Sequence, residues 1–210
     1  MNGRREEILN IFENLAARFG LSRTTIKDIA REAGVSVGTI YNEFSDKEAL
    51  IDAFWQRAVE HCIRRLDGLA AQDLPPEALL RQLILGHIKG YNEELRNNRG
   101  VYELMMESAI SYIGKKVLGH RQVIQRELAG RVENVLLAGI RCGAFEVAGD
   151  TATTALRFVE AFTEYTAPPL VVAREAEDVI RDAASMFSFV VRALRRGARA
   201  GGNENTAGVC

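Results

Sequence analysis

Residues 26–43 read IKDIAREAGVSVGTIYNE, and this stretch decides the fold of the N-terminal part of the chain. Two short segments with helical spacing of apolar residues flank Gly34, and the small residue Ala30 falls where two helices would cross. A bulky side chain at Ala30 would push the helices apart, whereas Gly34 can take the positive φ that a tight turn needs. Val35 and Ile40 are the expected buried pair. The spacing predicts a helix-turn-helix, in which the second helix enters the DNA major groove.

Helical spacing of apolar residues continues through almost the whole chain, and no stretch alternates as a half-buried strand does. The sequence therefore predicts an all-α protein with about nine helices. Gly20 is the expected left-handed cap of the first helix, and Pro168 with Pro169 is expected to separate the last two. The expected helices cover residues 4–19, 25–34, 36–42, 45–67, 75–97, 101–111, 115–141, 150–166 and 174–196.

Three helix starts carry recognisable capping signals. Thr25 with Asp28 and Ser45 with Glu48 have the spacing of a capping box, and Asp150 suits the N-cap of the eighth helix. Near residues 44–47 short helices with tight turns give way to long ones. We therefore expect a DNA-binding domain over 1–46, a ligand-binding and dimerisation domain over 47–196 that shares the fourth helix, and a disordered tail over 197–210.

The N-terminal stretch resembles the DNA-binding domain of the tetracycline-repressor (TetR) family of bacterial transcription regulators. The resemblance runs from Ile8 to about Ala53, and the remaining chain matches in helix number and size. Its carriers are residues 19–20, 24–30, 33–41, 44 and 47–50. The resemblance implies a cytoplasmic homodimeric regulator, a repressor released from double-stranded operator DNA by a small-molecule effector.

The resemblance also assigns roles within the helix-turn-helix. Ser36 is expected to cap the recognition helix, with Val37, Gly38 and Thr39 facing base edges. Phosphate contacts set the register of the protein on DNA and carry no sequence preference. Some of these residues have a purely structural alternative: Thr25 and Ser36 as caps, and Tyr41 as a cover of the small core. The predicted DNA-binding residues are Thr24, Thr25, Ser36, Val37, Gly38, Thr39, Tyr41, Asn42 and Lys47.

The net charge of the chain gives the prediction of DNA binding little support. The chain carries 27 Lys and Arg against 28 Asp and Glu, a formal net charge of -1. Glu43 stands where the family often has an aromatic residue or His beside the phosphate backbone, and a carboxylate there repels DNA unless it turns away. DNA affinity must therefore rest on the local placement of charges, with a monomer binding modestly.

The last two helices have wide apolar arcs, which predict that they pair with a second copy in a two-fold four-helix bundle. Phe162 and Phe187 are candidates for the subunit seam. An apolar effector is expected among aromatic and Met side chains, although plain core packing is an alternative for each of them. The predicted effector residues are Trp55, His87, Tyr91, Met105, Met106, Phe158, Phe162 and Tyr165.

Several other classes of protein are not expected. The sequence has none of the phosphate-loop, dinucleotide, zinc-protease or nucleophile-elbow motifs, so we do not expect an enzyme or a cofactor. The three His and three Cys residues lack metal-ligand spacing, and no apolar run could span a membrane. The acidic residues at the N-terminus argue against secretion and for a cytoplasmic protein. The alternative function is an all-α dimer that binds small molecules and does not bind DNA.

Overall fold

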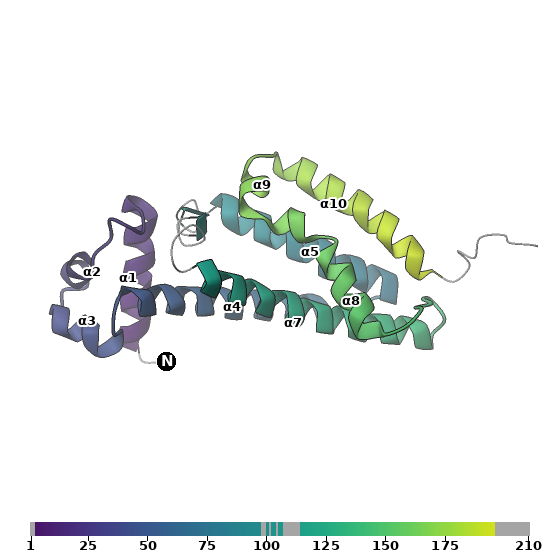
Figure 1. Ribbon diagram of the computed structural model, residues 1–210, viewed down its shortest axis with the longest axis horizontal. Helices are drawn as coiled ribbons and strands as arrows, with labels where there is room; N and C mark the ends of the chain where they lie inside the picture. Colours follow the sequence, from purple (N-terminus) through teal and green to yellow (C-terminus); the bar gives the residue numbers. More distant parts are fainter. Residues whose placement is uncertain (1–2, 98–99, 101, 104, 107–113, 196–210) are drawn as a thin grey trace, which may run out of the picture.

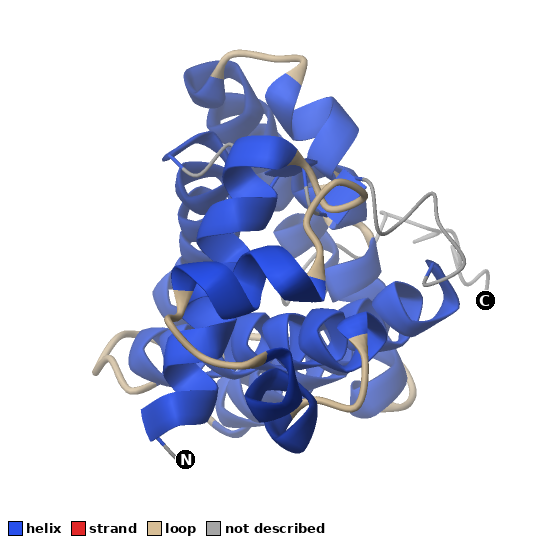
Figure 2. Cartoon of the chain, turned by 90° about the vertical axis from the view of Figure 1, so that its left-hand side faces the viewer, coloured by secondary structure: helices blue, strands red, loops and turns tan. Residues whose placement is uncertain are grey.

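The structure is a computed structural model that describes residues 3–97, 100, 102–103, 105–106 and 114–195. The described chain is all-α, as predicted, and Figures 1 and 2 show its helices joined by short loops. Most of the predicted helix over 101–111 and the whole predicted tail over 197–210 lie outside the described residues. The elements are α1 Gly3–Phe19, α2 Ile26–Glu32, α3 Val37–Glu43, α4 Lys47–Ala70, α5 Pro76–Asn97, α7 Gly114–Arg141, α8 Thr151–Glu160, the 3-10 turn η1 Thr163–Thr166, α9 Pro168–Val172, α10 Ala176–Val190 and the 3-10 turn η2 Val191–Leu194.

The local signals of the first three helices are confirmed. Gly20 ends α1 with φ 87°, and Gly34 joins α2 to α3 with φ 64°, a conformation that a side chain with a Cβ rarely adopts. Thr25 and Asp28 form the predicted capping box at the start of α2. Ala30 is 3% exposed and Ile40 is fully buried, whereas Val35 is only half-buried at the edge of the core.

The predicted cap of α4 is wrong by one residue. Asp46, and not Ser45, is the N-cap: its carboxylate accepts a 2.8 Å hydrogen bond from the backbone N–H of Ala49. The Ser45 hydroxyl instead donates to the Asp46 carboxylate at 3.2 Å. A carboxylate also interacts favourably with the positive end of the helix dipole, which favours Asp over Ser at this position.

This assignment gives a stability prediction with a matched control. We expect Asp46→Ala to lower the free energy of unfolding by about 1 kcal/mol, because the N–H of Ala49 loses its acceptor. Ser45→Ala removes only an exposed hydroxyl and should change stability by less than about 0.5 kcal/mol. Urea unfolding of the two variants measures both values. Equal losses would mean that Ser45 shares the capping role.

The C-terminal helices differ from the prediction in two places. The eighth helix ends at Glu160, six residues early, and the chain continues as η1. Pro168 and Pro169 do not separate two helices directly; they occupy the first turn of the short helix α9, where the missing N–H of proline costs nothing. The last helix therefore begins at Ala176 and passes into η2 at Val191.

The buried apolar residues form two clusters. The smaller one lies at the N-terminal end and runs from Ile8 on α1 to Trp55 on α4. The larger one runs from Cys62 on α4 through α5, α7 and α8 to Leu194 in η2. In Figure 1, α4 extends from the bundle of α1–α3 along the other helices, so one helix contributes to both cores. A division at residues 46 and 47 stays a prediction.

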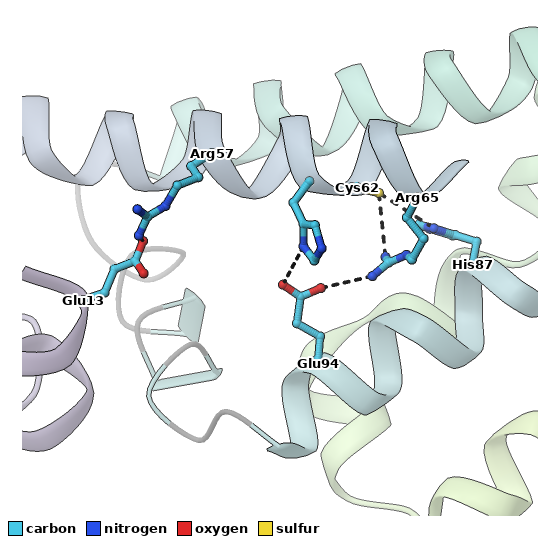
Figure 3. Close-up of polar contacts among 7 residues, drawn as sticks. Glu13, Arg57, Cys62, Arg65, His87 and Glu94 are labelled. Atoms are coloured by element: carbon cyan, nitrogen blue, oxygen red, sulfur yellow. Dashed lines mark hydrogen bonds and ion pairs between the residues drawn. The ribbon is translucent and has the colours of Figure 1, made fainter. Parts of the chain in front are cut away.

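Polar contacts hold α1 against α4. Arg57 on α4 pairs with Glu13 on α1, as Figure 3 shows, and donates to Glu6 at 3.1 Å and to Asn10 at 2.7 Å. Burial raises the pKa of the Glu13 carboxyl even though the Arg57 guanidinium opposes this shift. A rotation of α4 would separate Arg57 from these partners. The contacts of Arg57 therefore act as a clamp that links the position of α1 to that of α4.

Candidate nucleic-acid interface and effector region

The first turn of α3 is fixed by hydroxyl groups. The Ser36 Oγ accepts a 3.1 Å hydrogen bond from the backbone N–H of Thr39, which makes Ser36 the N-cap as predicted from the sequence. The hydroxyls of Ser36 and Thr39 also lie 2.9 Å apart, and either can be the donor. The Thr39 side chain, which is predicted to contact a base edge, is thus held in place by the Ser36 cap.

The surface of α3 is open where base contacts are predicted. Gly38 is exposed, and a Cβ added there would meet only the Ser36 hydroxyl, at 3.6 Å. Val37 and Thr39 are half-buried, Asn42 is exposed, and the Tyr41 ring is 51% exposed. The exposure of Tyr41 argues against its alternative role as a cover of the core.

The two threonines before α2 differ in position. Thr24 is 2% exposed, and its hydroxyl donates to the carbonyl of Gly20 at 2.9 Å. Thr25 is exposed, and its hydroxyl donates to Asp28 at 2.6 Å and accepts from the Asp28 N–H at 3.2 Å. The bond from the Thr25 hydroxyl, together with a 3.2 Å bond from the Thr25 backbone N–H to the same carboxylate, lowers the pKa of the Asp28 carboxyl. The burial of Thr24 favours a structural role, so Thr25 is the better candidate for a phosphate contact.

Lys47 and Arg5 contact backbone carbonyls that lie far from them in the sequence. The Lys47 ammonium donates to the carbonyl of Leu21 in the turn before α2. The Arg5 guanidinium lies 4.0 Å above the Phe44 ring and donates to the carbonyl of Glu43. Arg5 was not among the predicted residues, because nothing in the local sequence connects α1 to the end of α3. The positive charge of Arg5 lies beside Glu43, the residue whose carboxylate is expected to repel DNA.

The predicted effector residues do not form a single group. Trp55 belongs to the smaller core and stacks on His120 of α7, with ring centroids 6.0 Å apart, and Met105 packs against the same core. In the larger core the ring centroids of Phe158 and Phe162 lie 5.6 Å apart. The larger core also holds Tyr165, whereas Met106 is half-buried.

Figure 3 shows His87 of α5 beside Cys62 and Arg65 of α4, in a polar cluster that also includes Glu94. The His87 Nδ1 lies 3.9 Å from the Cys62 sulfur, and the rings of His87 and Tyr91 are 6.5 Å apart. Arg65 donates to Glu94 at 3.2 Å and lies 3.9 Å from the same sulfur. Burial, assisted by the charge of Arg65, lowers the pKa of His87 to about 4, so the imidazole is neutral at pH 7.

An open groove of about 510 Å³ lies between the start of α5 and the end of α10. Phe187 and Val191 form its apolar part, and Arg81, Arg192 and Arg195 lie around it. None of the predicted effector residues lines this groove.

Comparisons with known proteins agree with the helix-turn-helix geometry. Residues 8–54 match the family described as bacterial regulatory proteins, tetR family. The repressor KstR2 of Rhodococcus jostii is 25% identical over 144 residues, which are 69% of each chain. KstR2 of Mycobacterium tuberculosis is 40% identical over 85 residues, which cover 40% of this chain and 42% of the relative. These relatives are named as transcriptional regulators and not as enzymes.

Solved structures share the fold along nearly the whole chain. FadR from Bacillus subtilis in complex with stearoyl-CoA has a TM-score of 0.64 at 17% identity and aligns with 90% of this chain and 98% of its own. A SmeT–triclosan complex has a TM-score of 0.63 at 20% identity, over 94% of each chain. SmeT is described as the repressor of a multidrug efflux pump of Stenotrophomonas maltophilia. No helix in the described residues is long and apolar enough to cross a membrane.

Proposed function

We propose that this chain, whose residues 8–54 match the tetR family of bacterial regulatory proteins, is a cytoplasmic homodimeric repressor released from its operator by a small molecule. The observation that carries the proposal is the open, hydroxyl-capped first turn of α3. Its N-cap fixes the backbone, and the exposed Gly38 leaves room for a close approach to a groove edge.

The DNA contacts divide into two groups. Val37, Gly38 and Thr39 lie in the first turn of α3, which in this motif faces base edges. Thr25, Tyr41 and Lys47 surround that turn with groups suited to phosphate oxygens, and Ser36 and Asn42 complete the surface. The bond from the Lys47 ammonium to the Leu21 carbonyl holds this positive charge at the start of α4, beside the turn before α2.

Two variants with their controls test this division. Lys47→Ala should weaken binding to specific and random DNA by the same factor and reduce the salt slope by about 1, because one phosphate contact is lost. Tyr41→Phe should also weaken binding to specific and to random DNA. Thr39→Ala should lower mainly the ratio of specific to random DNA affinity, by a factor equivalent to about 1 to 3 kcal/mol at the contacted base pair. Thr39→Ser keeps the hydroxyl and should keep this ratio.

Fluorescence anisotropy over a range of salt concentrations measures these affinities on a duplex selected from a random pool. Lys89→Ala is the matched control, because Lys89 is exposed on α5 in the larger domain. If Lys47→Ala behaved like this control, the phosphate role of Lys47 would be wrong. Wild-type binding with no salt dependence would instead favour the alternative function, a ligand-binding dimer without DNA.

We assign dimerisation to α8 and α10, with the exposed apolar strip of α10 at the centre of the seam. Phe162 and Phe187, the seam residues expected from the sequence, are each 3% exposed or less within one chain, so they pack its own core and cannot form a seam. Phe189 is 70% exposed on α10, with Met186 one turn before it and Ala193 one turn after. A second copy that covers this strip would remove the largest exposed ring of the described residues from water.

The effector belongs in the larger domain. FadR and SmeT have this fold and are described in complex with stearoyl-CoA and triclosan, which supports a small-molecule effector for this chain. Because α4 contributes to both cores and Arg57 clamps it to α1, a ligand that shifts α4 would also move the helix-turn-helix. By thermodynamic reciprocity, operator DNA must weaken effector binding by the same factor.

A further inference from the structure

The groove between the start of α5 and the end of α10 combines an apolar base with charged sides. The two helices lie side by side (Figure 1), and Phe187 of α10 and Val191 of η2, each 2% exposed, form the base of the groove. Pro75 and Ala78 line the α5 side and are exposed. The groove volume of about 510 Å³ lies within the range of about 300 to 1,000 Å³ that is usual for small-molecule sites. These features suit the apolar body of a small ligand.

Two exposed arginines, one from each side, line the same groove. Arg81 comes from α5, and its guanidinium carbon lies 5.6 Å from the centroid of the Phe187 ring. Arg192 comes from η2, and its Nε donates to the Ser188 carbonyl at 2.9 Å. These contacts hold both guanidiniums at the groove. A ligand in the groove therefore meets a positive charge from each side.

A third arginine of the groove is neutralised by a carboxylate. Arg195 forms an ion pair with Glu77, in which its Nε donates at 3.0 Å, and this pair joins the end of η2 to the first turn of α5. Among the described residues that line the groove, Arg81 and Arg192 thus leave two positive charges. A phosphate monoester carries about 1.5 to 2 negative charges at pH 7, and Arg binds phosphate through paired N–H donors. A phosphate monoester therefore matches this groove better than a carboxylate, which has a single charge.

The groove lies on the opposite side of α10 from the proposed dimer seam. Successive residues of an α-helix are turned by about 100°, so the direction midway between Phe187 and Ser188 is about 180° from that midway between Met186 and Phe189. The first pair lines the groove, and the second pair belongs to the exposed apolar strip. A second subunit on that strip would leave the groove accessible.

We propose that this groove binds a phosphate monoester with an apolar body. The phosphate binds Arg81 and Arg192, and the body packs on Pro75 and Ala78 above the Phe187 ring. The site is separate from the operator surface and from the predicted effector residues, so it goes beyond the proposed function and does not depend on it.

Calorimetric titration of the full chain with 1-naphthyl phosphate tests this proposal at about pH 7.5, where a phosphate monoester is close to doubly charged. The compound should bind about tenfold more tightly than 1-naphthol, which lacks the phosphate, and than inorganic phosphate, which lacks the apolar body. 1-Naphthaleneacetate, which has one negative charge, should bind more weakly than 1-naphthyl phosphate.

Variants of the two arginines locate the binding site. Arg81→Gln and Arg192→Gln should each weaken binding of 1-naphthyl phosphate by about tenfold, because each removes a charge-assisted contact. Arg81→Lys keeps the charge and should retain part of the affinity. Arg181→Gln is the matched control, because Arg181 is exposed on α10, pairs with Asp178 and does not line the groove. Circular dichroism checks that each variant is folded.

The proposal fails if 1-naphthyl phosphate binds no more tightly than 1-naphthol and inorganic phosphate. It also fails if both glutamine variants bind the compound as the wild type and the Arg181→Gln control do, since binding would then take place elsewhere. Equal affinities for 1-naphthaleneacetate and 1-naphthyl phosphate would contradict the choice of a phosphate monoester.

Discussion

Phe189→Glu is expected to turn the protein into a monomer and to reduce operator affinity by about 100-fold or more. A dimer that binds two half-sites gains an effective concentration for its second domain, and this gain is lost when the subunits separate. A charge at the centre of an apolar seam would be buried without a partner, which is strongly unfavourable. Because Phe189 is 70% exposed in one chain, the substitution should leave the fold of the subunit intact.

Light scattering measures the mass of the variant, and circular dichroism checks that it is folded. Leu118→Glu is the control: Leu118 is 59% exposed on α7, outside the proposed seam, and its replacement should leave a dimer. A Phe189→Glu variant that stays dimeric would contradict the assignment to α8 and α10. A wild-type chain that is monomeric at micromolar concentration would contradict the homodimer itself.

The sequence predicted the caps and turns of the first three helices well because their determinants are local. The capping box of Thr25 with Asp28, the cap at Ser36 and the positive φ of Gly34 each depend on residues within a few positions. The cap of α4 was misplaced because Ser45 and Asp46 are adjacent residues of the same capping class. Only the geometry at Ala49 distinguishes them.

The early end of α8 could not be predicted from local spacing. Helical spacing of apolar residues continues to Tyr165, and neither Gly nor Pro interrupts it. Instead, distant side chains bond to η1: Arg121 donates to the Thr163 carbonyl, Gln125 contacts the Thr163 hydroxyl at 3.3 Å, and Asn92 donates to the Tyr165 carbonyl. These carbonyls find partners from α5 and α7, so tertiary contacts override the helical preference of the segment.

The same limit applies to the effector region. Aromatic and Met residues identified two real packing clusters, but the sequence could not say that Trp55 would join the smaller core and Phe158 the larger one. Arg121 of α7 and Glu94 of α5 act on the Tyr91 phenol, and Arg65 of α4 acts on His87. On each of these helices they are ordinary charged positions. Their effect depends on the burial of Tyr91 and His87, which only the assembled helices produce.

Removing the buried imidazole of His87 should abolish a large part of the acid sensitivity of the fold. The pKa of His87 is lowered from 6.5 to about 4 in the folded chain, so between these values the unfolded chain binds more protons. Stability is therefore fully present above about pH 6.5 and is lost as the pH falls toward 4. The difference in pKa corresponds to about 3 kcal/mol of unfolding free energy, because one pKa unit is worth about 1.4 kcal/mol.

Urea unfolding of the wild type and of His87→Leu between pH 7 and pH 4 measures this contribution as the difference between two pH profiles. Carboxyl groups titrate in both proteins and cancel in that difference, which should reach about 3 kcal/mol near pH 4. His61→Leu is the matched control, since the His61 side chain is 57% exposed on α4 and faces the same Glu94. Parallel profiles for the wild type and His87→Leu would mean that water or a partner group stabilises the charged imidazole inside the domain, and that the polar cluster between α4 and α5 is open to protons.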